Sequence, residues 1–507
     1  MSENLGVFAP KLRASERLAF ITPLDETRQR DISYRRLNDR ADAIGLGLRQ
    51  AGLAPGDRVA LLARNSIDYI ASLLGIMRAG LVAVPINFRF PADTIGHILN
   101  DSGSRLLLGD EDQLARVESD LPRAAFGPEL ERYQRAGGLT PFAPGADDLA
   151  LLLYTSGSTG IPKGVRLTHA SHRWVVKTRL ARRELNDERV LIAAPFYHMN
   201  ALALALLTLA SHVSTVLLPQ FDARQYIQAV DRYRCSWLTA VPPMLAMMLR
   251  ERDLLAESDL SCVRAIRMGS APVSDSLYHA LRQWLPRARI INAYGTTEGG
   301  PVVFGPHPQG LPAPAGSPGY PHAGVSLRLR NAAGELNDEG VLEMRSPALM
   351  QGYHQRPDAR PFTADGYYVT GDVFRRDEEG FYWFVGRHDD MFVCGGENVW
   401  PGEVEKLLER HPQVQQACVV PVPDDIKGQK PVAWVIARPG ETLAPDSLKS
   451  WALDHGPAYL HPRHIWLTDR FPLAGTNKVD RRALQQEALA RLVTESAHQA
   501  GCKITLR

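Results

Sequence analysis

The chain has no large excess of charge of either sign. Its 58 lysines and arginines stand against 56 aspartates and glutamates, which leaves a net charge of +2 over 507 residues. Proteins that bind nucleic acid through their overall field carry a broad basic surface, so this balance argues against that class of partner. A strongly anionic ligand would have to be held by a few local groups.

Cysteine is scarce and scattered. The sequence contains no CxxC pair and no cysteine spacing typical of metal ligands. This excludes a disulfide framework and a zinc-ribbon type of site, and it indicates idle or buried thiols in a reducing compartment. The five cysteines are Cys235, Cys262, Cys394, Cys418 and Cys502.

Long hydrophobic runs are missing, except for one stretch that could be considered as a membrane span. The N-terminal residues MSENLGVFAPKLRASER lack the apolar core of a signal peptide. Ala201–Leu218 is almost entirely apolar and reaches the lower length limit of a membrane span. However, His212 and several Ser and Thr residues interrupt it, and Pro219 follows. A buried helix followed by a buried strand explains it better, so we expect a soluble, cytoplasmic protein.

What is present is an alternation of strands and helices. Hydrophobic residues make up 45% of the chain and charged residues 22%, as in ordinary globular proteins. The length indicates about two to four structural units, at roughly 100–200 residues each. Short apolar runs alternate with helical patterns, which predicts parallel βαβ units with buried strands. Strands are expected at Val59–Ala63, Leu81–Pro85, Val190–Ala194, Val213–Leu218 and Trp237–Val241, and a helix at Ile67–Ala79.

The pattern changes twice further along the chain. Proline and glycine crowd Gly310–Gly324, and short alternating segments follow, which predicts a smaller antiparallel or barrel-like unit. A second change comes near Gly386–Asp390. Beyond it we expect a compact α+β segment with a helix at Gly402–Arg410 and strands near Ala417–Pro421 and Val432–Ala437.

The segment Leu151–Val165, LLLYTSGSTGIPKGV, carries the strongest chemical signal. An apolar strand leads into a loop with three glycines, four hydroxyl residues and Lys163. Glycines let a backbone approach phosphate, successive N–H groups and hydroxyls form an anion cavity, and the lysine adds a point charge. The loop is not a Walker A motif, because Pro162 precedes the lysine and Gly164 follows it. The alternative is a flexible surface turn, which rarely combines a preceding apolar strand with so many hydroxyls.

This loop resembles the phosphate-loop signature of the adenylate-forming superfamily of acyl-CoA synthetases, adenylation domains and luciferases. Further segments resemble that family in its order along nearly the whole chain. The clearest are Tyr294–Glu298 (YGTTE), Tyr368–Asp372 (YVTGD), Gly386–Val399 (GRHDDMFVCGGENV) and Pro472–Leu484 (PLAGTNKVDRRAL), and the weaker ones are Gly56–Ser66, Gly75–Pro85 and Gly269–Pro272.

The resemblance implies a fold and a domain division. The fold is α/β, with a large N-terminal domain of layered βαβ sheets, a small β-barrel-like subdomain, and a small mobile C-terminal α+β domain. The large domain would span residues 1–386, with the subdomain at about 310–386. Residues 387–388 would lead into a hinge at Asp389, and residues 389–507 would form the C-terminal domain.

The resemblance also implies an ATP site. An aromatic ring can stack on adenine, a carboxylate can hold both ribose hydroxyls, and a carboxylate with a hydroxyl can hold Mg²⁺. It assigns adenine stacking to Tyr294, the ribose to Asp372 with Arg387, and the metal to Glu298 with Thr155. Asp372 is expected to lie in a tight Thr-Gly-Asp turn. The nucleotide-binding residues would be Thr155, Ser156, Gly157, Ser158, Thr159, Gly160, Lys163, Gly269, Ser270, Ala271, Asn292, Tyr294, Gly295, Thr296, Thr297, Asp372, Arg387 and Lys478.

Lys478 is implied as the cation for the first chemical step, in which negative charge builds up around the α-phosphorus. Asn477 precedes it where the family usually has glycine, and asparagine is the residue that best tolerates left-handed geometry after glycine. Gly395 and Gly396 resemble the loop that borders the coenzyme A channel after the small domain rotates.

The acid is expected to lie near His198, Asn200, Pro243, Met268, Gly299 and Gly300. His198 is alternatively a hydrogen-bonded core histidine. These mostly small or apolar residues favour a fatty, aryl or short to medium apolar acid over a dicarboxylate, with Arg267 as the one residue that argues the other way.

The expected activity is that of an AMP-forming acid–CoA ligase that uses ATP, Mg²⁺ and coenzyme A, with Lys478, Glu298, Thr155 and His198 as catalytic residues. Alternatives are an enzyme that loads a carrier-protein thiol and a non-catalytic nucleotide-binding scaffold. The chain stops soon after the Leu484 motif without an appended carrier domain, which favours free coenzyme A. No nucleic-acid partner is expected, and the resemblance allows a homodimer.

Overall fold

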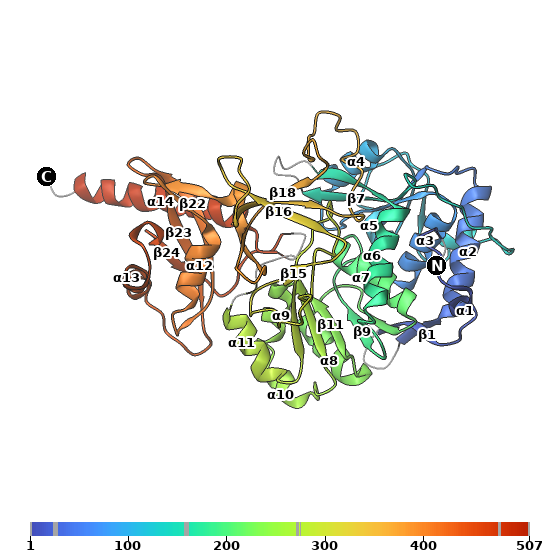
Figure 1. Ribbon diagram of the computed structural model, residues 1–507, viewed down its shortest axis with the longest axis horizontal. Helices are drawn as coiled ribbons and strands as arrows, with labels where there is room; N and C mark the ends of the chain where they lie inside the picture. Colours follow the sequence, from blue (N-terminus) through green and yellow to red (C-terminus); the bar gives the residue numbers. More distant parts are fainter. Residues whose placement is uncertain are drawn as a thin grey trace.

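A computed structural model describes residues 3–23, 29–156, 162–269, 273, 275–474 and 478–504 (Figure 1). Two mainly parallel sheets form the bulk of the N-terminal part, and three mainly antiparallel sheets follow. Across the described ranges, no helix is both long and apolar enough to cross a membrane.

The first large sheet has six strands in the order β6-β5-β3-β4-β7-β8. All neighbours are parallel except β7 and β8, which pair antiparallel. The strands are β3 (Arg58–Leu62), β4 (Val82–Pro85), β5 (Ser104–Gly109), β6 (Arg123–Ala125), β7 (Leu149–Ser156) and β8 (Pro162–Thr168). The accompanying helices are α2 (Tyr34–Gln50), α3 (Ile67–Arg78), α4 (Ala92–Ser102), α5 (Glu111–Leu114), the 3₁₀ turn η1 (Leu130–Tyr133) and α6 (His169–Ala181).

The second large sheet has seven strands in the order β13-β12-β11-β9-β10-β1-β2, and only β2 runs antiparallel to its neighbour. The strands are β1 (Leu18–Pro23), β2 (Gln29–Ser33), β9 (Arg189–Ile192), β10 (Ser214–Leu217), β11 (Trp237–Ala240), β12 (Ala265–Gly269) and β13 (Arg289–Ala293). The helices are α1 (Pro10–Arg13), α7 (Met199–Ser211), α8 (Ala223–Tyr233), α9 (Pro242–Met248), α10 (Arg252–Glu257) and α11 (Asp275–Trp284).

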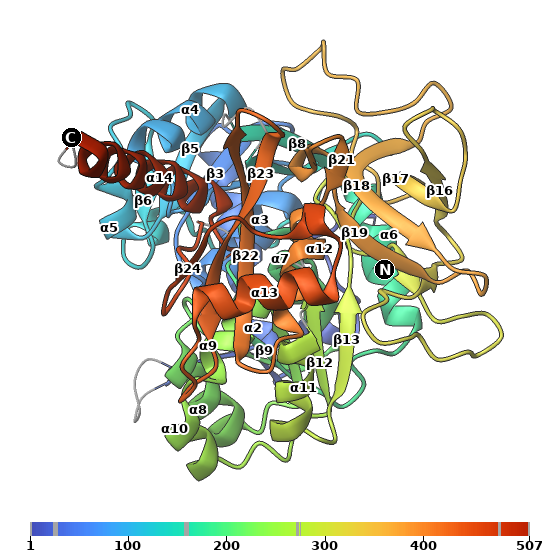
Figure 2. The ribbon, with the colours of Figure 1, turned by 90° about the vertical axis from the view of Figure 1, so that its left-hand side faces the viewer.

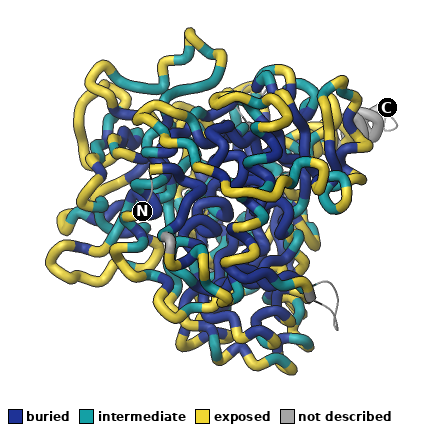
Figure 3. The backbone as a smooth tube through the Cα atoms, turned by 90° about the vertical axis from the view of Figure 1, so that its right-hand side faces the viewer, coloured by how far each residue is buried: buried dark blue, intermediate teal, exposed yellow. Residues whose placement is uncertain are grey.

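One hydrophobic core joins the two large sheets. Residues of α3 and α7 belong to the same buried cluster as residues of both sheets. Every residue of α3 is buried, as expected for a helix that is apolar on nearly all sides. The side chain of Ser66 caps it by accepting a hydrogen bond from the N–H of Tyr69. Figure 3 shows the buried trace running through the middle of this part, with exposed loops at its margin.

The chain then forms two small antiparallel sheets: β14 (Phe304–Gly305) with β15 (Tyr320–Pro321), and β16 (Ser326–Arg330), β17 (Glu339–Arg345), β18 (Tyr368–Arg376) and β19 (Tyr382–Arg387) in sequential order. The antiparallel pattern agrees with the prediction for residues 310–386. Among the described residues, β16 and β19 lie at opposite edges of the sheet and do not pair, so the sheet is open and not a closed barrel. Four strands are too few to close a barrel.

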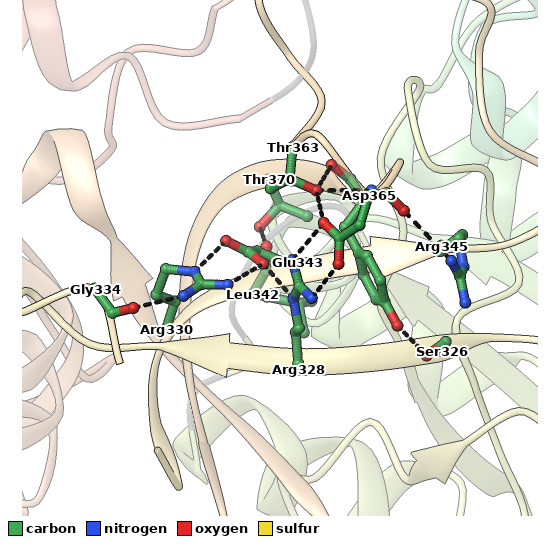
Figure 4. Close-up of polar contacts among 11 residues, drawn as sticks. Ser326, Arg328, Arg330, Gly334, Leu342, Glu343, Arg345, Thr363, Asp365 and Thr370 are labelled. Atoms are coloured by element: carbon green, nitrogen blue, oxygen red, sulfur yellow. Dashed lines mark hydrogen bonds and ion pairs between the residues drawn. The ribbon is translucent and has the colours of Figure 1, made fainter. Parts of the chain in front are cut away.

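A network of charges ties this four-stranded sheet together (Figure 4). Glu343 on β17 is 3% exposed and accepts from Arg328 Nε at 2.5 Å and Arg330 Nε at 2.8 Å. Arg328 also contacts Asp365 through both terminal nitrogens, at 2.6 and 2.9 Å. Because β18 lies beside β17, this network also steadies the strand that carries Asp372.

The C-terminal part has its own sheet, in which β21-β20-β23-β22 are neighbours and β24 pairs with β23. Separate hydrophobic clusters lie on its two faces, and Figure 2 shows it from its outer side. Its elements are the 3₁₀ turn η2 (His388–Asp390), β20 (Phe392–Cys394), β21 (Glu397–Val399), α12 (Pro401–Glu409), β22 (Val414–Asp424), β23 (Gly428–Ala437), α13 (Pro445–His455), η3 (Ala458–Leu460), β24 (Ile465–Leu467) and α14 (Arg481–Ile504).

Candidate active site

A cleft of about 2040 Å³ lies between the C-terminal part and the two large sheets. The residues at the carboxyl ends of β7, β12 and β13 line it, as do residues just after β11. In open α/β sheets, ligands bind in crevices outside the carboxyl ends of the strands. The residues predicted for the nucleotide that line this cleft are Thr155, Lys163, Gly269, Asn292, Tyr294, Gly295, Thr296, Thr297, Asp372, Arg387 and Lys478.

The two strands that flank the predicted phosphate loop, β7 and β8, pair antiparallel. Thr155 on β7 pairs with Lys163 on β8, so the lysine lies on a strand directly opposite the threonine. Its Nζ is 5.6 Å from the centre of the Tyr353 ring. Six predicted nucleotide-binding residues lie outside the described part of the chain, namely Gly157, Ser158, Thr159, Gly160, Ser270 and Ala271; Ser156 ends β7, and its side chain is likewise not described.

Asp372 is the centre of a buried polar group. Its side chain accepts a hydrogen bond from Tyr294 Oη at 2.5 Å on one oxygen and from Arg387 Nη1 at 2.8 Å on the other. Burial raises the pKa of the carboxyl group, and the Arg387 guanidinium opposes that rise. A carboxylate has about four acceptor sites, so about two remain for ribose hydroxyls after these contacts.

The sequence predicts a tight turn at Thr370-Gly371-Asp372, and this prediction is wrong. The three residues lie inside β18. Val369 and Val373 of β18 pair with Glu343 and Val341 of β17, so β18 carries extra residues between these two pairs. Gly371 has a φ of +73°, which a residue with a side chain adopts only with strain. The bulge re-aims a strand residue, and here it turns Asp372 toward Tyr294.

Glu298 comes five residues after the end of β13, and residues from a later segment of the chain contact it. Its carboxylate accepts a hydrogen bond from Tyr353 Oη at 3.2 Å, and its backbone carbonyl accepts one from Met350 N at 2.8 Å. Tyr353 is placed by a β-bridge to Val165 on β8. Burial raises the pKa of Glu298. An anchored carboxylate in a cleft that Thr155 also lines fits Mg²⁺, which takes one or two protein carboxylates and otherwise phosphates and water.

Lys478 reaches the same group from the C-terminal part. It precedes α14, and its carbonyl accepts a hydrogen bond from Ala474 N at 2.8 Å. Burial in the cleft lowers the pKa of its amine, which the charges of Asp372 and Glu298 raise and that of Arg387 lowers. Two cations and two carboxylates from distant parts of the chain thus interact in one place. The described residues do not include Asn477, whose effect on this loop stays a prediction.

The predicted hinge and channel residues lie in different surroundings. Asp389 is in the turn η2, directly after β19, and lines the cleft. Gly395 and Gly396 form an exposed turn between β20 and β21, with φ of +63° and +94°. They do not line the cleft in this arrangement, and their place beside a coenzyme A channel stays a prediction.

The predicted acyl pocket is partly wrong. His198, Asn200 and Pro243 line the cleft. Met268 does not: it is fully buried in the core under the sheet, because side chains alternate along β12 and Arg267 takes the side that faces the cleft. Gly299 and Gly300 are buried too; an added Cβ would lie 2.6 Å from Met344 and 2.7 Å from Ala348, so both glycines serve close packing.

Sequence reasoning missed Tyr353. Its contact with Glu298 depends on a bridge between segments far apart in the chain, and no local pattern marks it. Arg267 was named only as an exception, although it lines the cleft and Met268 does not. The signal that could have distinguished Arg267 from Met268 is the alternation of side chains along a strand, which puts adjacent residues on opposite faces of the sheet.

Comparison with known proteins agrees with this geometry. The family described as AMP-binding enzyme matches residues 11–354, and the AMP-binding enzyme C-terminal domain matches residues 403–478. The chain is 34% identical over 460 residues to a feruloyl-CoA synthase of Amycolatopsis sp, covering 88% of this chain and 92% of the relative. It is 33% identical over 492 residues to the fatty acid–[acyl-carrier-protein] ligase ScoC of Streptomyces coeruleorubidus, covering 92% and 93%.

A solved structure is similar over nearly the whole length. ATP-bound MatB from Rhodopseudomonas palustris superposes with a TM-score of 0.86 at 27% identity, covering 96% of this chain and 99% of that one. The fold, the cleft and both family matches lead to one conclusion: the chain belongs to the AMP-binding enzymes of the adenylate-forming superfamily.

Proposed function

We propose that the protein is an AMP-forming acid–CoA ligase. One observation carries the proposal: Lys478, Glu298, Asp372 and Arg387 interact electrostatically in a single cleft at the carboxyl ends of parallel strands. A site with this balance of charges holds a polyphosphate and a sugar side by side, and it places a cation where charge develops during transfer of a nucleotidyl group.

The reaction has two halves. In the first, a carboxylate oxygen of the acid attacks the α-phosphorus of ATP, the bond to the bridging oxygen of the β-phosphate breaks, and pyrophosphate leaves. Lys478 stabilises the charge on the phosphate oxygens, Asp372 and Arg387 hold the ribose, and Tyr294 lies beside the adenine. Glu298 and Thr155 would hold Mg²⁺, which neutralises phosphate charge when bound.

In the second half, the thiolate of coenzyme A attacks the acyl carbonyl carbon and the bond to the AMP oxygen breaks. We propose that the C-terminal domain, residues 389–507, turns about Asp389 relative to residues 1–386, with residues 387–388 as the linker and residues 310–386 as a subdomain. The turn withdraws Lys478 and brings Gly395 and Gly396 to the channel. In this proposal the thiol approaches past His198, which lines the cleft. We also propose that the protein is located in the cytoplasm and forms a homodimer.

The relative ScoC supports a second candidate, transfer of the acyl group to a carrier-protein thiol. The test is to incubate the protein with ATP, Mg²⁺ and a panel of acids, and to measure pyrophosphate release and then thioester formation with coenzyme A or with an acyl carrier protein. Thioester on coenzyme A supports the ligase, and thioester on the carrier alone supports the second candidate. A folded protein that releases no pyrophosphate with any acid would leave only a nucleotide-binding scaffold.

A further inference from the structure

Arg267 lines the cleft beside Asn200, in the part where the acid is predicted to lie. It lies on β12, two residues before Gly269, which also lines the cleft. At about 3.3 Å per strand residue, Arg267 is roughly 7 Å deeper along the strand than Gly269. Because residues two apart point to the same side of a strand, Arg267 lies below the end of β12 that borders the nucleotide.

The contacts of Arg267 leave most of its donors available. Its Nη1 donates to Asn200 Oδ1 at 3.1 Å, and its Nη2 donates to the Pro301 carbonyl at 3.3 Å. A guanidinium has five N–H donors, and both of these acceptors are neutral. Within the described part of the chain, no carboxylate forms an ion pair with Arg267. The Asn200 amide nitrogen is buried and has no acceptor among the described residues, so this corner has an excess of donors.

The charges around Arg267 have the same sign as Arg267 itself. Glu184 forms ion pairs with Arg179 at 3.1 Å and with Arg182 at 3.6 Å, and all three arginines act on it electrostatically. Burial and the nearby Arg179 lower the pKa of Arg267 to about 9. Three guanidinium groups thus share one carboxylate, which leaves this cluster with an excess of positive charge.

An uncompensated buried charge is costly, and an anionic ligand group would relieve that cost. Arg267 is the one member of this cluster that lines the cleft; the other three members do not line it. A ligand in the cleft therefore meets the positive charge of the cluster through Arg267. Its planar fork suits two carboxylate oxygens in particular.

We propose that Arg267, assisted by Asn200, binds a second carboxylate at the end of the acid remote from the carboxyl group that is adenylated, so that the substrates are dicarboxylic acids. This rests on the proposed acid–CoA ligase function and names its substrate class. It reverses the preference for an apolar acid that the pocket residues suggested in the sequence, because Met268, Gly299 and Gly300 do not line the cleft and Arg267 does.

The competing interpretation is that Arg267 only braces α7 against the segment after β13 through Asn200 and Pro301. The two interpretations differ in how the enzyme treats a matched pair of acids. The probes are straight-chain dicarboxylic acids from succinic to sebacic acid, each compared with its own monomethyl ester. The ester keeps the length and the reacting carboxylate but removes the remote charge.

Pyrophosphate release is measured for each pair with the wild-type enzyme and with Arg267→Met, Arg267→Lys and Arg182→Met. We expect the wild-type enzyme to favour at least one diacid over its ester by about 30-fold or more in kcat/KM. Arg267→Met should lose that factor through KM for the diacid and leave the ester unchanged, and Arg267→Lys should retain part of it. Arg182→Met removes a charge of the same cluster from outside the cleft, and it should change the preference by less than about 5-fold.

Three results would overturn the inference. The first is equal use of diacid and ester by the wild-type enzyme. The second is equal loss for both by an Arg267→Met protein that still binds AMP in calorimetry, which would identify Arg267 as a brace. The third is release of pyrophosphate with no acid at all, which would refute the acid–CoA ligase proposal itself. Turnover of the esters without a preference for diacids refutes only the substrate class.

Discussion

Replacing Lys478 by alanine should separate the two half-reactions. Lys478 and Arg387 interact with Asp372 and Glu298, so the four charges sum to zero, and the substitution leaves one negative charge in excess where a polyphosphate must bind. At about 5 Å and an effective dielectric constant of about 20, one such charge pair is worth roughly 3 kcal/mol, or about 200-fold. Removal of one stabilising group for transition-state charge costs a similar 10²–10³-fold.

The assay measures pyrophosphate release for the first half-reaction and thioester formation from supplied acyl-AMP for the second. Lys478→Ala should slow the first by about 100-fold or more and leave the second within about 5-fold of wild type, because Lys478 has no role once pyrophosphate has left. Lys478→Arg keeps the charge and should lose less. Lys449→Ala, which removes a surface lysine of the same part that pairs with Asp446, should change neither. Equal losses in both half-reactions after Lys478→Ala would refute the reasoning.

The same residue predicts a pH dependence. Burial lowers the pKa of Lys478, and the proposed role needs the protonated amine. Pyrophosphate release should therefore decline, as the pH rises, at a lower pH than an ordinary lysine with a pKa of about 10.4 would give. The decline should be absent from thioester formation with supplied acyl-AMP and should move to higher pH in Lys478→Arg. An identical alkaline limb in both half-reactions would show that another group is responsible.

Three further predictions concern groups around the cleft and in the core. Tyr353→Phe removes the hydrogen bond to Glu298 and should raise the Mg²⁺ concentration for half-maximal pyrophosphate release about 10–100-fold; an unchanged Mg²⁺ dependence would exclude this positioning role. Asp372→Asn should raise the Kd for AMP about 10–100-fold in calorimetry, whereas wild-type affinity would mean that the ribose lies elsewhere. Burial lowers the pKa of His169 to about 4, and its Nδ1 accepts the Leu5 N–H at 3.0 Å. Its contribution to the free energy of unfolding is thus complete above pH 6.5 and is lost, by up to roughly 3 kcal/mol, as the pH falls toward 4; the same acid loss in urea unfolding of His169→Gln would contradict this.

The buried framework could be predicted from the sequence because burial leaves a local mark. The apolar stretch Ala201–Leu218 was expected to form a helix and then a strand, and it forms α7 and β10. The helix expected at Ile67–Ala79 is α3, one residue shorter. Such elements follow from hydrophobic runs and their periodicity, which a single segment contains.

The parts that sequence reasoning missed depend on a partner segment. The bulge at Gly371 exists only relative to β17, so Thr-Gly-Asp alone read as a turn. The choice between Arg267 and Met268 for the cleft depends on which face of β12 the neighbouring helices cover. Tyr353 reaches Glu298 only because its loop bridges to β8. Motif resemblance pointed to Asp372, Glu298 and Lys478. It also named Tyr294 and Arg387, which contact Asp372, but not Tyr353, which contacts Glu298.

Arg387 ends β19 and stays bonded to Asp372, whereas the proposed pivot at Asp389 comes after it. On the proposed division, Asp372 and Arg387, which would hold the sugar, lie in the stationary part. Of the four charged groups, Lys478 alone lies in the part that would move. The reactive mixed anhydride, acyl-AMP, would stay bound through its nucleotide while the residues around its acyl group change. The enzyme would thus pass from one half-reaction to the next without releasing the acyl-AMP intermediate into solution. Little free acyl-AMP should therefore accumulate when thiol is scarce.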